Sequence, residues 1–300
     1  MNADLPDRPS YPLEQLLELP DGRHAEWEAS GAGPPMLWIE GGPGLPAHLA
    51  RPDVALVADR FRAHLVNAPG CGRSSTPTTA DGYGLDAHVR YFDDVRRALG
   101  LGAVTVMGHS WGGLVALALA VAVPEAVERL VIIDGYAGEA SVPEDVAATE
   151  RDRALDRVRQ EPWFEPALAA FGEDLDITSR QLDERFAACW PLYFAHPESP
   201  AAREHLARLG RETRWNIEAA RAWTPEPPLD LGPRLSRIRC PTLVIVGEHD
   251  FICGPAWNRQ IADGIPGAVY AEIPGVGHFP QYEAPDGFRR VIFDWMEPSS

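Results

Sequence analysis

Hydrophobic and polar positions follow two alternating periods along the first 140 residues. Short apolar runs have the length and β-rich composition of strands, and two longer segments repeat apolar residues at helical spacing. The apolar runs are Pro35–Ile39, His64–Ala68, Ala103–Met107 and Arg129–Ile133, and His24–Ser30 alternates apolar and polar residues like an exposed strand; the helical segments are Leu85–Leu99 and Leu114–Val123. Strands that alternate with helices predict a parallel sheet with right-handed crossovers.

The pattern changes after Gly138. Residues 141–228 contain no convincing strand, and Pro and Gly separate four helical segments: Pro143–Gln160, Phe164–Phe171, Thr178–Phe194 and Pro200–Trp223. The earlier alternation resumes with Thr242–Val246, Ala268–Ile273 and Pro285–Trp295. We therefore expect an α/β core in two parts, residues 1–140 and 229–300, with an inserted helical cap at residues 141–228.

Composition narrows the class of partner. The net charge of −17 disfavours nucleic acid and anionic membranes, since both attract basic surfaces. The four cysteines are dispersed without a C-x-x-C pair, so we expect free thiols, no metal and no cofactor. The first residues lack the basic start and apolar run of a secretory signal, and no apolar run approaches the length of a membrane span. A cytoplasmic location is the simplest expectation, and the oligomeric state stays open.

The strongest candidate chemistry lies at Gly108-His109-Ser110-Trp111-Gly112. This G-x-S-x-G sequence follows a predicted strand and precedes a predicted helix, which is the setting of a nucleophile elbow. Glycines on both sides allow strand and helix to approach closely around a strained serine. We therefore predict Ser110 as the nucleophile.

A serine hydroxyl needs a base, and histidine suits that role because its pKa lies near neutral pH. Asp250 follows the apolar run Thr242–Val246, and His278 lies on a glycine-rich loop after the next strand. Both loops leave the sheet edge that carries the elbow, and the order serine, acid, histidine is that of the fold. We predict Asp250 as the acid and His278 as the base. Glu248 is a rival acid, and His109 and His249 are rival bases, although their positions next to Ser110 and Asp250 disfavour both.

The sequence Glu40-Gly41-Gly42-Pro43-Gly44 follows another predicted strand. A Gly-Gly turn beside the nucleophile can direct a backbone N–H at a developing oxyanion, and the second donor would be the N–H of the residue after the serine. Gly42 and Trp111 are the expected donors. An ordinary strand-ending turn is the alternative for this segment.

Taken together, these motifs resemble one known family. GGPG, PGCGRS, GHSWGG, GEHD, the Cys253-Gly254-Pro255 turn and GVGH occur in family order and are similar to the proline iminopeptidase branch of the α/β-hydrolases. The resemblance covers residues 24–140 and 235–296. It implies an α/β-hydrolase fold and a serine aminopeptidase that removes a small N-terminal residue, with acidic cap residues holding the substrate amine.

The sequence departs from that family at the sites that matter for substrate. Glu40 stands where the family usually has histidine, and Trp190-Pro191-Leu192-Tyr193-Phe194 lacks the acid of the family's cap motif. Glu198, Glu212 or Glu218 could substitute. The expected substrate contacts are Glu40, Trp190, Tyr193, Phe194 and Trp215.

Three functions stay open. The first is a proline iminopeptidase-like aminopeptidase acting on short peptides or amides. The second is an esterase, thioesterase or lactonase for a hydrophobic acyl group, which the aromatic cap suits. The third is a ligand-binding or non-hydrolytic protein of the same fold. Epoxide hydrolase and dehalogenase chemistry is disfavoured because it needs a carboxylate in place of Ser110.

Overall fold

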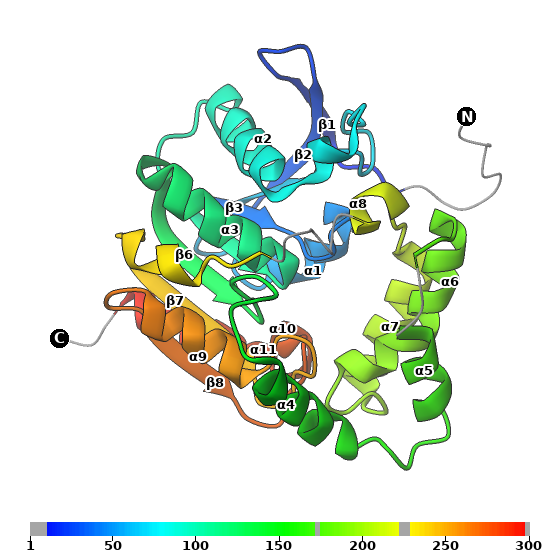
Figure 1. The fold of residues 1–300 in the computed structure, drawn as a ribbon. Coiled ribbons are helices and arrows are strands. Elements are labelled where there is room, and N and C mark those ends of the chain that lie inside the picture. The colour runs from blue at the N-terminus through cyan, green and yellow to red at the C-terminus, as the bar shows by residue number, and fades with distance from the viewer. Residues whose placement is uncertain (1–10, 172–174, 222–228, 298–300) are drawn as a thin grey trace.

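The computed structural model describes residues 11–171, 175–221 and 229–297. Eight strands form one sheet in the order β1-β2-β4-β3-β5-β6-β7-β8 (Figure 1). The strands are β1 (Gln15–Glu18), β2 (His24–Ser30), β3 (Pro35–Ile39), β4 (Arg62–Val66), β5 (Val104–His109), β6 (Val127–Ile133), β7 (Thr242–Gly247) and β8 (Val269–Ile273). β2 pairs antiparallel with β1 and β4, and every other pairing is parallel. The mostly parallel sheet expected from the alternating pattern is confirmed.

Side chains of the central strands alternate between two buried layers. In β3, Leu37 and Ile39 pack on one face of the sheet, and Met36 and Trp38 pack on the other. Because both faces are covered, these strands read as continuous apolar runs in the sequence.

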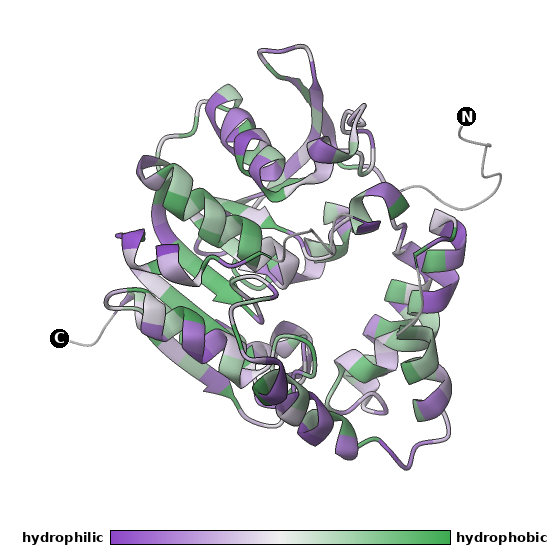
Figure 2. Ribbon diagram, viewed as in Figure 1, coloured by the Kyte–Doolittle hydropathy of each residue, from purple (hydrophilic) through white to green (hydrophobic). Residues whose placement is uncertain are grey.

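Helices cover both faces of the sheet. The first face is covered by α2 (Leu85–Ala98), α3 (Trp111–Ala122) and α9 (Pro255–Gly264), and the second by α1 (Arg51–Ala55) and α11 (Pro285–Met296). α3 is buried over nearly its whole length and is coloured mostly as hydrophobic in Figure 2. The short helix α10 (Pro280–Glu283) precedes α11.

Between β6 and β7 the chain forms the inserted helical cap. Its helices are α4 (Glu144–Asp156), α5 (Phe164–Phe171), α6 (Ser179–Cys189), α7 (Pro200–Glu212) and α8 (Ile217–Arg221), and a 3₁₀ turn spans Trp190–Tyr193. An aromatic cluster holds the cap together and joins it to Phe251, Phe279 and Tyr282 of the core. Figure 1 shows α5, α6 and α7 standing apart from the sheet, beside the ends of its central strands.

Some elements differ from the sequence expectation. The segment Pro200–Trp223 was expected as one helix, but α7 ends at Glu212 and α8 begins at Ile217; Trp223 lies outside the described residues. The break is stable because the Asp183 carboxylate accepts the Trp215 N–H and Asn216 caps α8. The short elements β1, α1, α9 and α10 were not anticipated. No helix in the described part of the chain is long and apolar enough to cross a membrane.

Candidate active site

Ser110 occupies the turn between β5 and α3. Its backbone has φ 55° and ψ −124°, a strained conformation for a residue with a Cβ atom. The N–H of Ser110 donates to the carbonyl of Ile133 at 2.9 Å, which ties the turn to β6. The side chain is thereby held at the carboxyl edge of the sheet, at the N-terminus of α3.

Two glycines make this turn sterically possible. A Cβ on Gly108 would collide with the carbonyl of Gly112, and one on Gly112 would collide with the carbonyls of Ile39 and Glu40. The G-x-S-x-G pattern therefore reflects the close approach of β5, α3 and the end of β3 around the serine.

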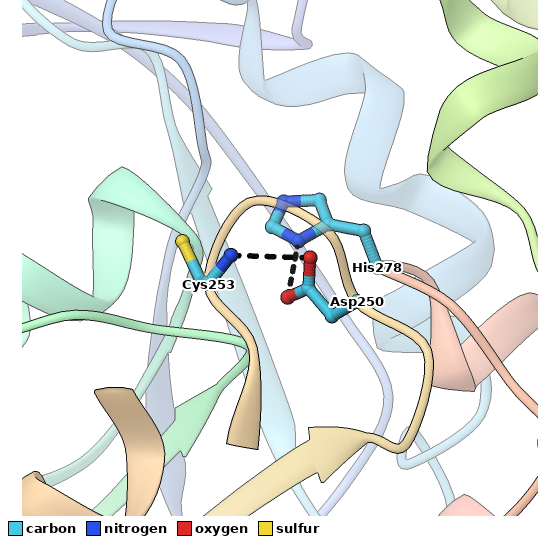
Figure 3. A group of neighbouring side chains, drawn as sticks. All are labelled: Asp250, Cys253 and His278. Carbon is cyan, nitrogen blue, oxygen red and sulfur yellow. Dashed lines mark hydrogen bonds and ion pairs between the residues drawn. The ribbon is translucent and has the colours of Figure 1, made fainter. Parts of the chain in front are cut away.

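His278 and Asp250 form a buried pair. Nδ1 of His278 lies 2.8 Å from Oδ2 of Asp250, and the side chains are 2% and 0% exposed. The other carboxylate oxygen accepts the N–H groups of Ile252 and Cys253 at 2.8 and 3.1 Å. Figure 3 shows the imidazole and the Cys253 main chain converging on this carboxylate.

The electrostatics of the pair fix its proton arrangement. Burial raises the pKa of Asp250, but His278 and the two backbone N–H groups outweigh it and hold the pKa below its ordinary value. An ionised Asp250 only accepts hydrogen bonds, so Nδ1 of His278 carries the proton. Nε2 is thereby left free as the basic nitrogen.

The Ser110 hydroxyl does not hydrogen-bond to His278 in the described structure. It lies beside the buried thiol of Cys253. Burial raises the pKa of this thiol well above its ordinary value, and the Ser110 hydroxyl offsets only part of that rise. Ser110 and His278 nevertheless line the same pocket. Hydrogen bonds between nucleophile and base are often long in ligand-free sites and tighten on substrate binding.

The rival residues have other partners. Nε2 of His109 lies 2.9 Å from the His278 carbonyl, and burial, with His278 nearby, lowers the pKa of His109 to about 3. Glu248 accepts the N–H of Gly275 at 2.9 Å, and its nearest histidine nitrogen, in His249, is 3.8 Å away. The geometry therefore brings Asp250, and not Glu248, to His278.

The Gly41-Gly42 loop packs directly against the nucleophile. A Cβ on Gly41 would lie 3.3 Å from the Cβ of Ser110, and Gly42 has φ 124°, a conformation that favours glycine. Gly41 and Gly42 line the pocket with Ser110, and Trp111 is the first residue of α3. Gly42, which lines the pocket with Ser110, and Trp111, which follows Ser110 in the chain, are thus both near the serine.

Glu40 lies at the end of β3 and lines the same pocket. Its Oε2 accepts the indole N–H of Trp38 at 3.0 Å, so the residue has a structural partner where the resembling family has histidine. Burial raises the pKa of Glu40, and the Trp38 N–H offsets this only in part. Nearby, burial and Glu40 raise the pKa of the Asp53 carboxyl to about 7.

The pocket above Ser110 has about 350 Å³ of empty space and a mostly aromatic wall. Its lining consists of Glu40, Gly41, Gly42, Leu45, His109, Ser110, Phe186, Trp190, Tyr193, Trp215, Ile252, His278 and Phe279.

Most of the expected substrate contacts lie in this lining, but Phe194 does not. Phe194 follows the 3₁₀ turn in extended backbone (φ −106°, ψ 139°) and packs against Phe279 at 5.2 Å between ring centroids. Four further lining residues were not predicted, because an apolar side chain at a pocket is indistinguishable from a core residue in the sequence: Leu45, Phe186, Ile252 and Phe279.

Asp134 is a further residue that the sequence analysis missed. It directly follows β6 with φ 46°, and its Oδ1 accepts the Gly247 N–H at 2.8 Å. Burial and the adjacent Asp250 raise the pKa of Asp134 well above its ordinary value. In the sequence, the signal that could have indicated Asp134 is its position as an acid directly after the predicted strand Arg129–Ile133.

Asp250, Cys253 and His278 place three potential metal-ligand atoms within 4.8 Å of one another. Their chemistry does not suit a metal, because Nδ1 of His278 is already engaged by Asp250. Thiols bind metals as thiolates, and burial keeps the Cys253 thiol protonated. The cluster is better described as the buried His278–Asp250 hydrogen-bonded pair with the Cys253 thiol beside it.

Comparisons with known proteins agree with this geometry. Residues 34–285 match the model of the alpha/beta hydrolase fold family. A 2-hydroxy-6-oxononadienedioate/2-hydroxy-6-oxononatrienedioate hydrolase from Dechloromonas aromatica is 30% identical over 247 residues, covering 80% of this chain and 78% of the relative. Haloalkane dehalogenase 2 from Mycobacterium tuberculosis is 28% identical over 293 residues, covering 96% and 97%.

Solved structures show the same fold. An alpha/beta fold family hydrolase from Bacillus anthracis superposes with a TM-score of 0.73 at 19% identity, covering 94% of this chain and 98% of that chain. An N-acyl homoserine lactone degrading enzyme superposes with a TM-score of 0.69 at 25% identity, covering 93% and 99%. None of these four proteins is described as an aminopeptidase, so they do not support the proline iminopeptidase branch. The fold, the site geometry and the family match together show that the chain belongs to the α/β-hydrolase fold family and is a hydrolase of the serine type.

Proposed function

We propose that this protein hydrolyses esters, thioesters or lactones of a small, uncharged, hydrophobic acyl group. The observation that carries the proposal is the wall of the pocket above Ser110. The cap contributes four aromatic side chains to it, Phe186, Trp190, Tyr193 and Trp215, and within the described lining it contributes no charged group.

An aromatic wall of this kind fits an acyl group better than a free α-amine. A buried ammonium needs a nearby carboxylate, and the cap acids that could have supplied one lie elsewhere. Glu198, Glu212 and Glu218 pair with Arg203, Arg208 and Arg221 at 2.5, 3.4 and 2.6 Å. The one acid in the described lining, Glu40, has its pKa raised by burial, which weakens it as an anchor for an amine.

Two indole N–H groups add a polar preference. Trp190 and Trp215 are buried, and the Nε1 atom of each has no hydrogen-bond partner among the described residues. A buried donor without a partner costs about 1–3 kcal/mol, so a substrate that accepts from it binds more tightly. Carbonyl, ester and lactone oxygens are acceptors of this kind, and an ammonium group is not.

The substrates of two relatives fit this site less well. The Dechloromonas relative is described as acting on a dioate, but no arginine is present in the described lining to neutralise carboxylates. Dehalogenation needs a carboxylate nucleophile, and Ser110 occupies that place.

In the proposed reaction, the Ser110 hydroxyl turns from Cys253 toward Nε2 of His278 and attacks the acyl carbon. His278 takes the hydroxyl proton, and Asp250 stabilises the resulting imidazolium through Nδ1. The N–H groups of Gly42 and Trp111 stabilise the oxyanion, and loss of one such donor costs about 3–4 kcal/mol. The protonated His278 then protonates the leaving group, and it activates water to hydrolyse the acyl-enzyme.

To test the proposal, turnover by the purified protein is measured on p-nitrophenyl esters of increasing chain length and on alanine and proline p-nitroanilides. We expect turnover of short-chain esters, little turnover of the anilides, and a loss of about 10⁶-fold in kcat in Ser110→Ala. Faster cleavage of the anilides, abolished by blocking their amine, would instead establish the aminopeptidase.

A further inference from the structure

Glu283 joins the catalytic loop to the cap. This residue ends α10, five positions after His278. Its Oε2 accepts the N–H of Gly277 at 2.7 Å and the N–H of Ala195 at 3.0 Å, and its Oε1 accepts the N–H of His196 at 2.8 Å. One carboxylate thus holds a backbone group beside the base and two backbone groups of the cap.

The cap backbone itself lies directly on the catalytic loop. We call residues Tyr193–His196 the cap strap. The N–H of His278 donates to the carbonyl of Tyr193 at 2.8 Å. A Cβ on Gly277 would lie 2.5 Å from that carbonyl oxygen and 2.9 Å from the N of Ala195. Glycine is therefore required at position 277 for the strap to reach the loop.

The strap is also held from its other side. The Arg157 guanidinium donates to the carbonyl of Ala195, so this one residue is fixed through both of its backbone polar groups. Tyr193, at the start of the strap, lines the substrate pocket, and its ring lies 5.5 Å from the His278 ring. Any displacement of the strap would thus move the pocket wall and the base together.

Three hydrogen bonds converge on the Glu283 carboxyl group, whereas the strap and the loop otherwise share one direct backbone bond through His278. Among the described contacts, Glu283 therefore makes more hydrogen bonds at this junction than any other side chain.

We propose that Glu283 is a positioning residue, which couples the position of the cap to the productive orientation of His278. The carboxylate touches no reacting atom and acts through Gly277 and the strap. A cap held in place presents Tyr193 to the acyl group and at the same time fixes the base. This inference rests on the proposed triad, which labelling of Ser110 by a fluorophosphonate checks first in the unmodified protein.

The experiment compares Glu283→Leu with Glu283→Gln, using Glu248→Gln as the matched control. Leucine has a similar size but no acceptor, whereas glutamine keeps one oxygen that can bridge Gly277 and Ala195. Glu248 accepts one backbone N–H, from Gly275, on the same loop, and does not contact the cap strap. Steady-state constants are measured for an acetyl ester, which is small enough to react without filling the cap pocket, and for a longer acyl ester.

We expect kcat on both esters to fall about 10- to 100-fold in Glu283→Leu, because small misplacements of a catalytic group cost rates of this order. Glu283→Gln should recover kcat to within a few-fold, and Glu248→Gln should match the unmodified protein. A fall confined to the KM of the longer ester would show that Glu283 only holds the cap, and would overturn the proposal.

A spectroscopic measurement decides the matter if Glu283→Leu does not fold. The far-downfield proton resonance of the His278–Asp250 hydrogen bond reports the orientation of the imidazole directly. In Glu283→Ala, which removes the acceptor without adding a bulky apolar side chain, we expect this resonance to broaden or shift, and in Glu283→Gln and Glu248→Gln to stay close to that of the unmodified protein. An unchanged resonance in Glu283→Ala would contradict a positioning role. Failure of the proposed function would appear separately, as absent fluorophosphonate labelling of unmodified Ser110.

Discussion

Two interacting carboxyl groups, those of Asp53 and Glu40, illustrate how single residues set the behaviour of this protein with pH. The Asp53 carboxyl accepts the hydroxyl of Tyr282 at 2.6 Å and is 2% exposed, and Glu40 lies close enough to affect its ionisation. The nearest cation is Arg208, which donates to the Tyr282 hydroxyl at 3.0 Å. Arg208 is shared with Glu212, so negative charge is in excess around this cluster.

Because the pKa of Asp53 is raised from 3.8 to about 7 on folding, the folded protein binds the extra proton. Its contribution to stability is fully present below pH 3.8 and is lost as the pH rises to about 7. The slope is at most about 1.4 kcal/mol per pH unit for one proton. In Asp53→Asn, urea unfolding between pH 4 and 7 should show a flatter decline than in the unmodified protein. Parallel curves for the two proteins would mean that Asp53 is not protonated in the folded state.

The triad shows which residues a sequence can and cannot reveal. Ser110, Asp250 and His278 could be predicted because glycines and strand ends mark their loops, and in the structure Asp250 and His278 form a direct hydrogen bond. Phe186 and Phe279 were missed because an apolar side chain that lines a pocket looks the same in sequence as one that fills a core. Glu283 carries no motif, and its role depends on a contact with the cap 87 and 88 positions away.

At the scale of elements, the nucleophile elbow depends on close packing between β5, α3 and the end of β3. Gly112→Ala should destabilise the protein by about 1–3 kcal/mol, because the added methyl meets the backbone carbonyls of Ile39 and Glu40 and those carbonyls cannot move freely. Urea unfolding measures this loss, and activity should fall with it as Ser110 is displaced.

Gly210→Ala is the control for that substitution. Gly210 lies in α7, and an added Cβ there meets no atom within 4 Å. Because glycine weakens a helix, alanine at this position should stabilise the protein by about 0.5–1 kcal/mol. Equal effects of the two substitutions would refute the packing argument for the elbow.

The elements themselves were largely predictable where periodicity was strong. β2, β3 and α5 have the bounds expected from the sequence, and the other predicted strands are shifted by a few residues at most. The prediction was wrong at Thr213–Asn216, where the helical pattern continues through a break that tertiary hydrogen bonds stabilise. The short helices α1 and α10 were missed because each has fewer than two turns of pattern, too little to define a period.

At the scale of the whole molecule, the charge of −17 should act on substrates before they reach the pocket. A negative field repels anionic esters and leaves neutral ones unaffected, and salt screens it over about 10 Å at 0.1 M. We expect kcat/KM for a monoester of a dicarboxylic acid to rise several-fold between low and moderate salt. The value for an uncharged ester of equal length should stay constant, and a rise for both esters would point to an effect of salt on the protein itself.

The sheet order has a consequence for how the protein loses activity on heating. The predicted nucleophile follows a strand in the middle of the sheet, whereas His278 follows β8, which forms one margin of the sheet and is only partly buried. Marginal strands fray at lower free energy than central ones. Turnover should therefore decline reversibly at temperatures where circular dichroism still reports an intact fold. At these temperatures Ser110 would keep its position, and His278 would be displaced from it.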